Sequence, residues 1–482
     1  MIYYCYIKII KGEKNTIMSL KKIELKTWHY ILIYIVMFIL HLFLYPINTI
    51  DEFYRYRVID GMHHGAILYK DINIITTPLI YYIAGLIFYI NNSVITMRII
   101  NIVYWIISLL FFHIICKKNN FNEGILFVLN FFILTFLMIT GTFYYDYNNL
   151  CLMFLVILIY ILLYKNFSYK NSFLIALLCC LIILTKQTTG VLITLGTAIS
   201  ILYLNKDKNK DFWKKVLLMV LTGILILSLF AVYLIITNNF VYFCDLCILG
   251  VSQFTQNFLL NNSAIIIIFI ILMLVCFSYR KSIEKLKNKN NVIYLIFIVV
   301  TIINSYPIFD IYHLSIPIML MFMLFFNSNN ILKKIILCPM LIGCIILFSS
   351  SLFENFYNTN NVRCNYKGYT GLMISEYLMS NCDEIEKVSN IYNKEVYVID
   401  KAASAYNYVL GIPNNYYDLL FTGHTGTTSS VEHVKNLQGK DCIIIINKLF
   451  NGNYQFNHEI YEYIINNYER IYETENFFVY KP

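Results

Sequence analysis

Long apolar stretches separated by short polar loops occupy most of the first 350 residues of the chain. A helix needs about 17–25 mainly apolar residues to cross the ~30 Å hydrocarbon core of a bilayer. By this measure the sequence predicts eleven membrane-spanning helices, at residues 28–46, 96–116, 124–141, 148–164, 171–185, 189–204, 215–237, 263–279, 291–306, 311–326 and 331–350. The pattern therefore predicts an α-helical polytopic membrane protein.

A shorter apolar segment, residues 78–90, interrupts this series. A helix of about thirteen residues extends only ~20 Å, which is too little to cross a bilayer upright. Its first residue is Pro78, and proline is favoured in the first turn of a helix. We therefore predict an interfacial helix within a first outer loop at residues 47–95.

The distribution of basic residues tests this arrangement. With residues 78–90 in the interface, the N-terminal arm and alternate loops lie on one side and contain 22 of the Lys and Arg residues before position 351. Because Lys and Arg concentrate in cytoplasmic loops, we predict that the N-terminus is inside. Residues 47–95 and everything after residue 350 are then outside. The predicted outer side has five basic residues before position 351: Arg55, Arg57, Lys70, Arg98 and Lys186.

The composition agrees with a membrane protein and narrows its partners. The 482 residues are 59% hydrophobic and 13% charged, and the net charge of +9 comes mostly from the predicted cytoplasmic loops. We therefore expect these lysines to contact the lipid bilayer and not nucleic acid. The abundance of Ile, Asn, Lys and Tyr is typical of an AT-rich bacterial genome, so we expect the plasma membrane of a bacterium. We expect no cleaved signal peptide, and Met18 is an alternative start.

Residues 351–482 differ from the rest, with lower hydrophobicity and an ordinary density of charge. Short β-branched runs at 396–400 and 442–447 predict buried strands, and 477–480 predicts a third. Segments 368–393 and 457–468 have the spacing of amphipathic helices. The chain therefore divides into a cytoplasmic arm (1–27), a transmembrane body (28–350) and a small extracytoplasmic α/β domain (351–482).

Ionisable residues are rare inside the predicted spans, and the polar residues at the outer ends of these spans form one set. A proton relay or an ion-coupled carrier would place such groups near the middle of the membrane. Their concentration at one interface instead indicates a reaction at the membrane surface on a lipid-borne substrate. The outer set comprises Asp51, Glu52, Asp60, His63, His64, Lys70, Asp71, Arg98, Asp146, Lys186, Gln187, Asp310 and His313.

Part of this set carries a family resemblance. Asp51-Glu52 follows the first span, and Tyr69-Lys70-Asp71 and Thr77-Pro78-Leu79 come later in the same loop. This order resembles the first outer loop of the GT-C glycosyltransferases, which include protein O-mannosyltransferases and the aminoarabinose transferase of lipid A. The resemblance covers roughly residues 28–330 and implies sugar transfer from a polyprenyl-phosphate donor to an acceptor outside the membrane. Other positions similar to patterns of the family are Arg98, Asp146, Thr185 to Thr188, and Phe309 to His313.

The residue types suggest roles in such a reaction. Sugar transfer needs a base for the acceptor hydroxyl and cationic help for the phosphate leaving group. Asp51 is the expected base and Glu52 the second choice, while an N-cap or a solvated interface charge is the structural alternative for either acid. Arg98 and Lys186 are the expected phosphate contacts. For these two cations the alternative is snorkelling to the interface.

The other residues expected to bind substrate are Tyr69, Asp71, Asp146, Gln187, Asp310 and His313. Asp146 can equally cap the next helix, and His313, three residues after Asp310, can make a purely structural hydrogen bond. The outer loops contain no Asp-x-Asp motif, and the 13 Cys show no metal-ligand spacing. We expect no cofactor and a metal-independent reaction, with a divalent ion as the alternative.

Two other classes of function compete with a transferase. A transporter or flippase of lipid-linked glycans is disfavoured by the absence of midplane charges and of repeated halves in the sequence. A polysaccharide polymerase or ligase shares the polyprenyl-linked substrate, but the early loop from the acids to Pro78-Leu79 favours the transferase. The sequence identifies neither the sugar nor the acceptor.

Overall fold

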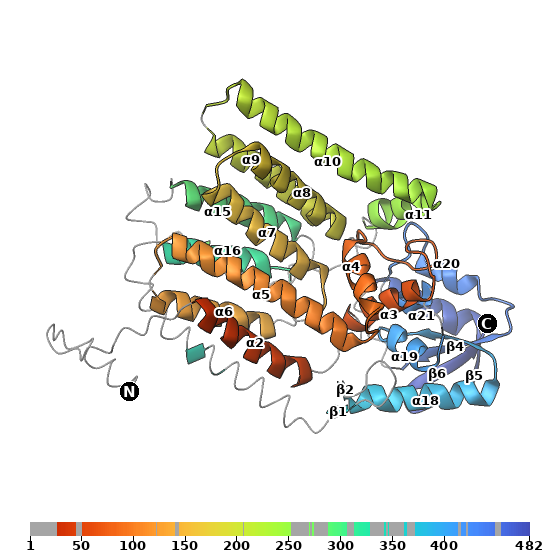
Figure 1. Ribbon diagram of the computed structural model, residues 1–482. Helices are drawn as coiled ribbons and strands as arrows, with labels where there is room; N and C mark the ends of the chain where they lie inside the picture. The colour runs from red at the N-terminus through yellow and green to blue at the C-terminus, as the bar shows by residue number, and fades with distance from the viewer. Residues whose placement is uncertain are drawn as a thin grey trace.

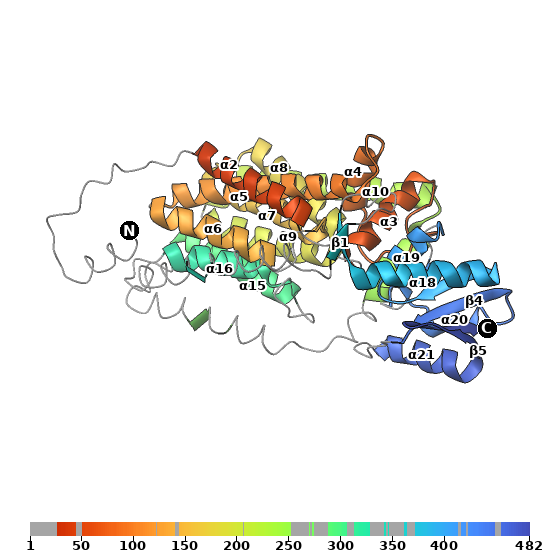
Figure 2. The same ribbon diagram turned by 90° about the horizontal axis from the view of Figure 1, so that it is seen from below.

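The computed structural model shows a bundle of roughly parallel and antiparallel helices with an α/β unit at one end (Figures 1 and 2). We call these parts the helical bundle and the C-terminal unit, the latter formed by the described residues from 361 to 482. The structure describes residues 27–44, 51–121, 123–139, 144–205, 207–251, 269, 272–273, 288–305, 313–327, 342–343, 346, 361–363, 372–412, 416–420, 423–448 and 455–482.

Nine described helices of the bundle each overlap a predicted span. Of these, α5, α7, α9 and α10 are long and apolar enough, by length and composition, to cross a membrane. The predicted spans 263–279 and 331–350 lie outside the described residues apart from a few positions. The nine helices are α2 (Thr27–Leu44), α5 (Val94–Lys118), α6 (Glu123–Ile139), α7 (Tyr147–Tyr164), α8 (Tyr169–Thr185), α9 (Gln187–Leu204), α10 (Lys210–Ile236), α15 (Lys289–Asn304) and α16 (Ser315–Asn327).

Small polar residues begin several of these helices. A side-chain oxygen at the N-cap accepts a hydrogen bond from a backbone N–H two or three residues later, which satisfies one of the donors that a helix start leaves open. The apolar runs therefore begin as helices at defined positions. The N-caps are Ser93 for α5, Asp146 for α7, Ser168 for α8 and Asn209 for α10.

The helix directions sort the charged residues to the two ends of the bundle. We call one end the lysine-rich end; the other, where α3, α4 and the C-terminal unit lie, is the site end (Figure 1). The orientation of these ends in a membrane stays a prediction. Residues at the lysine-rich end include Lys117, Lys118, Lys165, Lys170 and Lys210.

Two short helices occupy the segment predicted to be the first outer loop. Helix α4 (Leu79–Phe88) confirms the apolar helix expected at 78–90, and its ten residues span only ~15 Å. The sequence pattern did not predict α3 (Asp51–His63), in which every residue from Glu52 to Gly61 is buried. Such all-round burial requires protein on every side, and α3 lies between the bundle and the C-terminal unit.

The C-terminal unit has a four-stranded sheet in the order β3-β4-β6-β5. The predicted strands are confirmed as β3 (Glu395–Ile399), β4 (Cys442–Asn447) and β6 (Phe477–Lys481), and β5 (Glu469–Glu473) completes the sheet. β3 pairs with β4 in parallel, and the other pairs are antiparallel. A two-stranded sheet, β1 (Asn361–Arg363) and β2 (Met373–Ser375), precedes it.

Helices cover both faces of the four-stranded sheet. Apolar residues of α18 (Glu376–Tyr392) and α19 (Ala403–Val409) share a core with one face, and this core continues into the bundle. α20 (Ser430–Lys435) and α21 (Gln455–Asn467) form a second core with the other face. The helix expected at 368–393 is shorter than predicted, because residues 373–375 form β2 and α18 begins at Glu376.

A buried ion pair joins α3 to the C-terminal unit. Arg57 donates from Nε to Asp418 Oδ2 at 3.3 Å and from Nη2 to the carbonyl oxygen of Ile412 at 2.6 Å. The other Asp418 oxygen accepts from Asn407 at 2.6 Å. Burial raises the pKa of Asp418, although the charge of Arg57 acts in the opposite direction. The pair and its hydrogen bonds hold the unit against α3.

Candidate functional site

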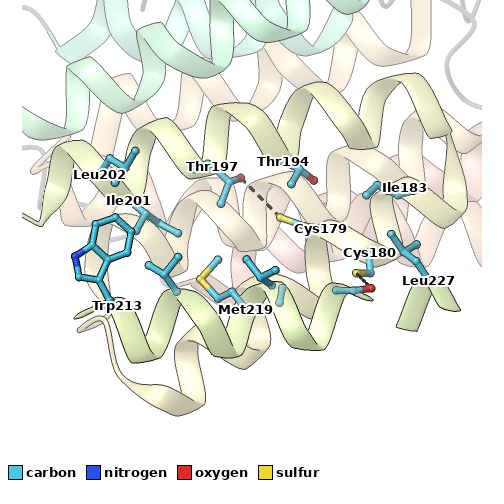
Figure 3. A pocket seen from close by; sticks show the side chains of 15 residues that line it. Cys179, Cys180, Ile183, Thr194, Thr197, Ile201, Leu202, Trp213, Met219 and Leu227 are labelled. Atoms are coloured by element: carbon cyan, nitrogen blue, oxygen red, sulfur yellow. Dashed lines mark hydrogen bonds between the residues drawn. The ribbon is translucent and has the colours of Figure 1, made fainter. Parts of the chain in front are cut away.

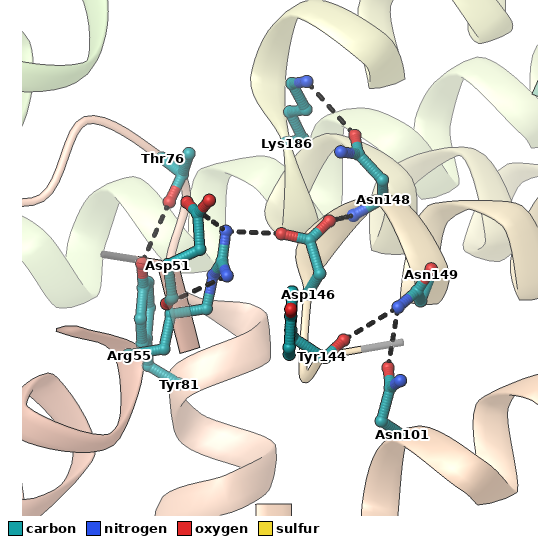
Figure 4. Close-up of polar contacts among 10 residues, drawn as sticks. All are labelled: Asp51, Arg55, Thr76, Tyr81, Asn101, Tyr144, Asp146, Asn148, Asn149 and Lys186. Carbon is teal, nitrogen blue, oxygen red and sulfur yellow. Dashed lines mark hydrogen bonds and ion pairs between the residues drawn. The ribbon is translucent and has the colours of Figure 1, made fainter. Parts of the chain in front are cut away.

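Arg55 of α3 and the start of α7 meet at the site end of the bundle (Figure 4). Arg55 forms an ion pair with Asp146, and both side chains are almost completely buried. Asp146 is also the N-cap of α7, since its Oδ1 accepts from the Asn148 backbone N–H at 2.7 Å. Asp146 therefore caps α7 and also pairs with Arg55, and its role in substrate binding stays a prediction.

A second cation, Lys186, reaches the same helix start. Its ammonium donates to Asn148 Oδ1 at 3.2 Å and lies 4.7 Å from the centre of the Tyr147 ring. The guanidinium of Arg55 lies 5.1 Å from the same ring. Tyr147 therefore contacts both cations, and aromatic rings stabilise a cation near their faces.

The turn between α8 and α9 fixes the position of Lys186. This residue is both the C-cap of α8 and the N-cap of α9, so the two helices are joined by a single residue. A Cβ added at Gly190 would lie only 2.3 Å from the Ile183 backbone. The close return of α9 onto α8 thus requires a glycine, and it directs Lys186 toward the start of α7.

Asp51, the first residue of α3, differs from its charged neighbours in exposure. Its side chain is 57% exposed, and its Oδ1 lies 3.5 Å from Arg55 Nη2. Arg55 also donates to the Asp51 backbone carbonyl at 3.0 Å. Asp51 and Asp146 therefore approach the same guanidinium, but only Asp51 presents its carboxylate to solvent.

Glu52 and Arg98 form a separate and closed ion pair. Arg98 donates from Nε to Glu52 Oε1 at 2.6 Å and from Nη2 to Oε2 at 2.8 Å. Its Nη1 donates to the carbonyl oxygen of Leu42 at 3.1 Å. Glu52 is 0% and Arg98 1% exposed. The expectations that Glu52 is a second base and Arg98 a phosphate contact stay predictions. In this arrangement neither side chain is exposed to solvent.

Tyr69 and Asp71 shape the loop that leads to α4. Tyr69 is buried and adopts a left-handed φ of 72°, and its hydroxyl donates to the Thr76 carbonyl at 3.2 Å. Asp71 is exposed and accepts from the Ile67 backbone N–H at 2.8 Å. Both contacts are within the loop, so a role of these two residues in substrate binding stays a prediction.

Two buried amides near this loop have an acceptor oxygen without a hydrogen-bond partner in the described part of the chain: Asn73 Oδ1 and Gln187 Oε1. The Asn73 amide nitrogen donates to the carbonyls of Tyr416 and His424. The Gln187 nitrogen donates to the carbonyls of Ile75 and Cys247, both at 2.8 Å. Because each nitrogen holds two carbonyls, neither amide can turn over to use its oxygen instead.

The C-terminal unit contributes His424 to the same region. The ring of His424 lies 6.2 Å from that of Tyr54, centre to centre, and burial together with the positive charge of Arg55 lowers the pKa of His424 to about 3. The next residues dock onto a π-helical turn, η1 (Cys244–Leu249), where Thr427 donates to Asp245 from its backbone N–H and its hydroxyl. A loop of the C-terminal unit therefore forms one wall beside Arg55.

The remaining predicted site residues are placed less fully. Asp310 lies outside the described residues, and the backbone carbonyl of His313 accepts from the Ser305 hydroxyl at 2.9 Å. Within the part of the chain that the structure describes, no three His, Cys, Asp or Glu side chains gather as a metal site. The guanidinium of Arg55 occupies the space between Asp51 and Asp146 where a cation would bind those two acids (Figure 4).

Sequence reasoning missed Arg55, Tyr147, Asn148 and His424 as site residues. Arg55 lies four residues after Asp51, a spacing that brings opposite charges together on a helix, but no apolar periodicity marked residues 51–63 as helical. His424 lies in the polar stretch 422–428, whose sequence fits an ordinary surface loop as well as a loop folded over an acceptor, and its position depends on how the C-terminal unit packs.

Comparison with known proteins identifies the fold. The sequence matches no protein-family model and no curated protein. Two crystal structures of ArnT from Cupriavidus metallidurans, a GT-C aminoarabinose transferase, are similar to this chain, one bound to undecaprenyl phosphate and one in the apo state. Their TM-scores are 0.55 and 0.56 at 9% sequence identity, and each alignment covers 94% of this chain and 97% of the ArnT chain. The chain therefore has a GT-C-like fold.

Proposed function

We propose that this chain, with its GT-C-like fold, is an integral membrane glycosyltransferase. It moves a sugar from a polyprenyl-phosphate donor to an acceptor of the bacterial cell envelope: a glycan, a lipid or a protein. The observation that carries the proposal is the meeting of Asp51, Arg55, Asp146 and Lys186 at one end of an apolar bundle. An acid that solvent can reach, next to two cations at a membrane surface, matches what sugar transfer from a lipid phosphate requires.

Asp51 is the proposed base. Its carboxylate accepts the proton of the acceptor hydroxyl as the acceptor oxygen bonds to the anomeric carbon and the bond from that carbon to the phosphate oxygen breaks. The exposure of Asp51 lets an acceptor approach, and Arg55 at 3.5 Å orients the carboxylate.

Lys186 is the proposed contact of the departing phosphate. Loss of the sugar leaves a phosphate monoester with additional negative charge, which a fixed cation stabilises most when the charge has developed. Arg55 adds positive charge to the same space, although Asp146 balances much of it. Arg98, in contrast, has its guanidinium bound to Glu52.

The side-chain oxygens of Asn73 and Gln187, to which no described residue donates, are proposed acceptors for hydroxyl or amino groups of the sugar. A buried acceptor without a donor is unfavourable by about 1–3 kcal/mol, and a sugar offers several donors. This proposal retains Gln187 as a substrate-binding residue and adds Asn73.

The direct test uses purified protein in detergent with polyprenyl-phosphate donors labelled in the sugar. A transferase passes the label to an acceptor or, slowly, to water, whereas a transporter has no second compartment and leaves the bond to the carrier intact. Binding of the donors without any cleavage, across several sugars and acceptors, would contradict the proposal. Cysteine labelling tests the orientation: the exposed positions 64 and 428 should react from outside, and the exposed positions 118 and 208 should react from inside.

A further inference from the structure

A polar cavity lies at the lysine-rich end of the bundle, opposite the proposed catalytic site. It has a volume of about 460 Å³ and lies among the ends of α7, α8, α9 and α15. Ligand pockets in proteins typically measure about 300–1,000 Å³. The polar side chains that line it are Lys165, Lys289, Asn166, Asn171, Asn205 and Tyr164.

The charge of this cavity is positive. No Asp or Glu lines it, and neither Lys165 nor Lys289 forms an ion pair with any described residue. The Lys165 ammonium lies 5.6 Å from the centre of the Tyr160 ring, a contact that leaves its charge unneutralised. Two such lysines beside asparagine amides fit a phosphate group, to which ammonium and amide N–H groups both donate.

A second cavity, of about 350 Å³, lies among α8, α9 and α10 and is apolar (Figure 3). Its hydroxyl groups do not offer hydrogen bonds to a ligand, because Thr194 and Thr197 donate to the carbonyls of Gly190 and Ile193 at 2.7 Å. The side chains of α10 that point away from the bundle, such as Leu217 and Leu225, are more than half exposed. A cavity with these properties beside a lipid-facing helix fits a hydrocarbon chain.

The two cavities are neighbours. Ile201 of α9 lines both, and the adjacent residues Ile175 and Ala176 of α8 line the polar and the apolar cavity respectively. The apolar cavity extends from Trp213 and Leu202, next to Ile201, toward Ile183 (Figure 3). Polar and apolar space therefore follow one another along the bundle, in the order in which a phospholipid presents its headgroup and its chain.

We propose that these cavities together bind one anionic glycerophospholipid from the leaflet at the lysine-rich end. Its headgroup phosphate contacts Lys165 and Lys289, and one acyl chain enters the cavity among α8, α9 and α10. The site is separate from the transferase chemistry, since Lys186 and Asp51 lie at the other end of the helices. The proposal therefore does not depend on the proposed function.

The test measures lipid binding to the purified full-length chain by native mass spectrometry and by thermal unfolding. Dioleoylphosphatidylglycerol should bind and raise the melting temperature more than dioleoylphosphatidylcholine or inorganic phosphate. The double variant Lys165→Gln/Lys289→Gln should bind phosphatidylglycerol about 10–30-fold more weakly, since each basic residue near anionic lipid contributes about 1 kcal/mol. The matched control Lys170→Gln/Lys208→Gln removes the same charge from exposed positions outside the cavity and should keep the affinity.

The chain cavity is tested with Ala198→Phe, which fills it, against Leu195→Phe on the outer face of the same helix. Only Ala198→Phe should weaken binding of phosphatidylglycerol. Full stabilisation by inorganic phosphate would show a free-anion site and overturn the lipid proposal, as would equal binding of the two phospholipids. Loss of undecaprenyl phosphate binding alone in Ala198→Phe would assign the apolar cavity to the chain of the donor, which also overturns the proposal.

Discussion

Two adjacent acids begin α3 and have opposite surroundings. Glu52 is buried and gives both carboxylate oxygens to Arg98, whereas the Asp51 side chain is 57% exposed and reaches Arg55 at 3.5 Å with one oxygen. Successive residues on a helix point about 100° apart, so one acid faces the bundle and the next faces the solvent. The comparison shows that two adjacent acids can differ in kind: Glu52 is held inside the protein by Arg98, and the carboxylate of Asp51 stays accessible.

The same contrast separates the two cations predicted to bind phosphate. Arg98 donates to two carboxylate oxygens and a backbone carbonyl, and it is 1% exposed. Lys186 is only partly buried, and its contacts include a neutral amide oxygen and an aromatic ring. A phosphate would have to replace the buried Glu52 carboxylate to reach Arg98, whereas the Lys186 side chain is partly exposed.

The largest expected effect is that of Asp51→Asn on activity. The substitution keeps size but removes the proton acceptor, so turnover should fall by ~10²–10⁴, while the melting temperature stays near that of the wild type. Turnover is measured with labelled donor in detergent, and Asp211→Asn, on an exposed acid at the lysine-rich end, is the control. Loss of turnover in Glu52→Gln but not in Asp51→Asn, with the fold intact, would show that Glu52 and not Asp51 is the base.

The next effect concerns stability. Arg98→Ala leaves the buried Glu52 carboxylate without its partner, and breaking one side of a buried ion pair destabilises a protein by about 3–5 kcal/mol. The melting temperature and the yield of folded protein should both fall. The double variant Glu52→Leu/Arg98→Met removes both charges and should recover much of this loss. A stable Arg98→Ala protein with weakened donor binding would restore Arg98 as a phosphate contact.

A smaller effect is expected at Lys186. Lys186→Ala should lower kcat/KM for the lipid-phosphate donor about 10–100-fold, the range for loss of a hydrogen bond to a charged group of about 1.5–3 kcal/mol. Lys186→Arg should recover part of the activity because it keeps the charge. The measurement is donor-dependent kinetics, with Lys170→Ala at the far end of α8 as control. Unchanged kinetics in Lys186→Ala would remove this residue from the site.

The smallest effect tests the burial of His424 beside Arg55, since burial first and the charge of Arg55 second lower its pKa. His424 has a pKa of about 3 in the folded chain and about 6.5 when unfolded, so only the unfolded chain takes up this proton as the pH falls below 6.5. Stability is therefore lost on acidification, by about 1–2 kcal/mol at pH 5. His424→Gln should flatten this part of the dependence of melting temperature on pH, and His458→Gln, at an exposed position, should not.

The sequence predicted the bundle well because apolar runs of spanning length are a direct physical requirement of a bilayer. The strands β3, β4 and β6 could also be predicted from the sequence, since buried strands are continuous runs rich in β-branched residues. Helix α3 was missed because it is buried on every side and its own buried residues include polar and aromatic ones such as Arg57, Tyr56 and Asp60. Its sequence therefore shows no apolar face.

The candidate site was predicted only in part for a similar reason. Charge and position singled out Asp51, Asp146 and Lys186, and the structure brings these three around the start of α7. The same criteria selected Glu52 and Arg98, because a sequence does not show which acid and base will neutralise each other. Pairing is decided by packing, which brings Glu52 to a residue 46 positions away.

The ion pair between Arg57 and Asp418 also has a consequence for the timing of synthesis. Asp418 follows Arg57 by 361 residues, and a ribosome adds about 5–20 residues per second. Helix α3 is therefore made roughly 20–70 s before the partner that buries it. During that interval the side of α3 that the C-terminal unit covers in the finished protein lacks its partner. The wall beside Arg55 is consequently among the last parts of the protein to be assembled, and a chain whose translation stops early ends with this site open.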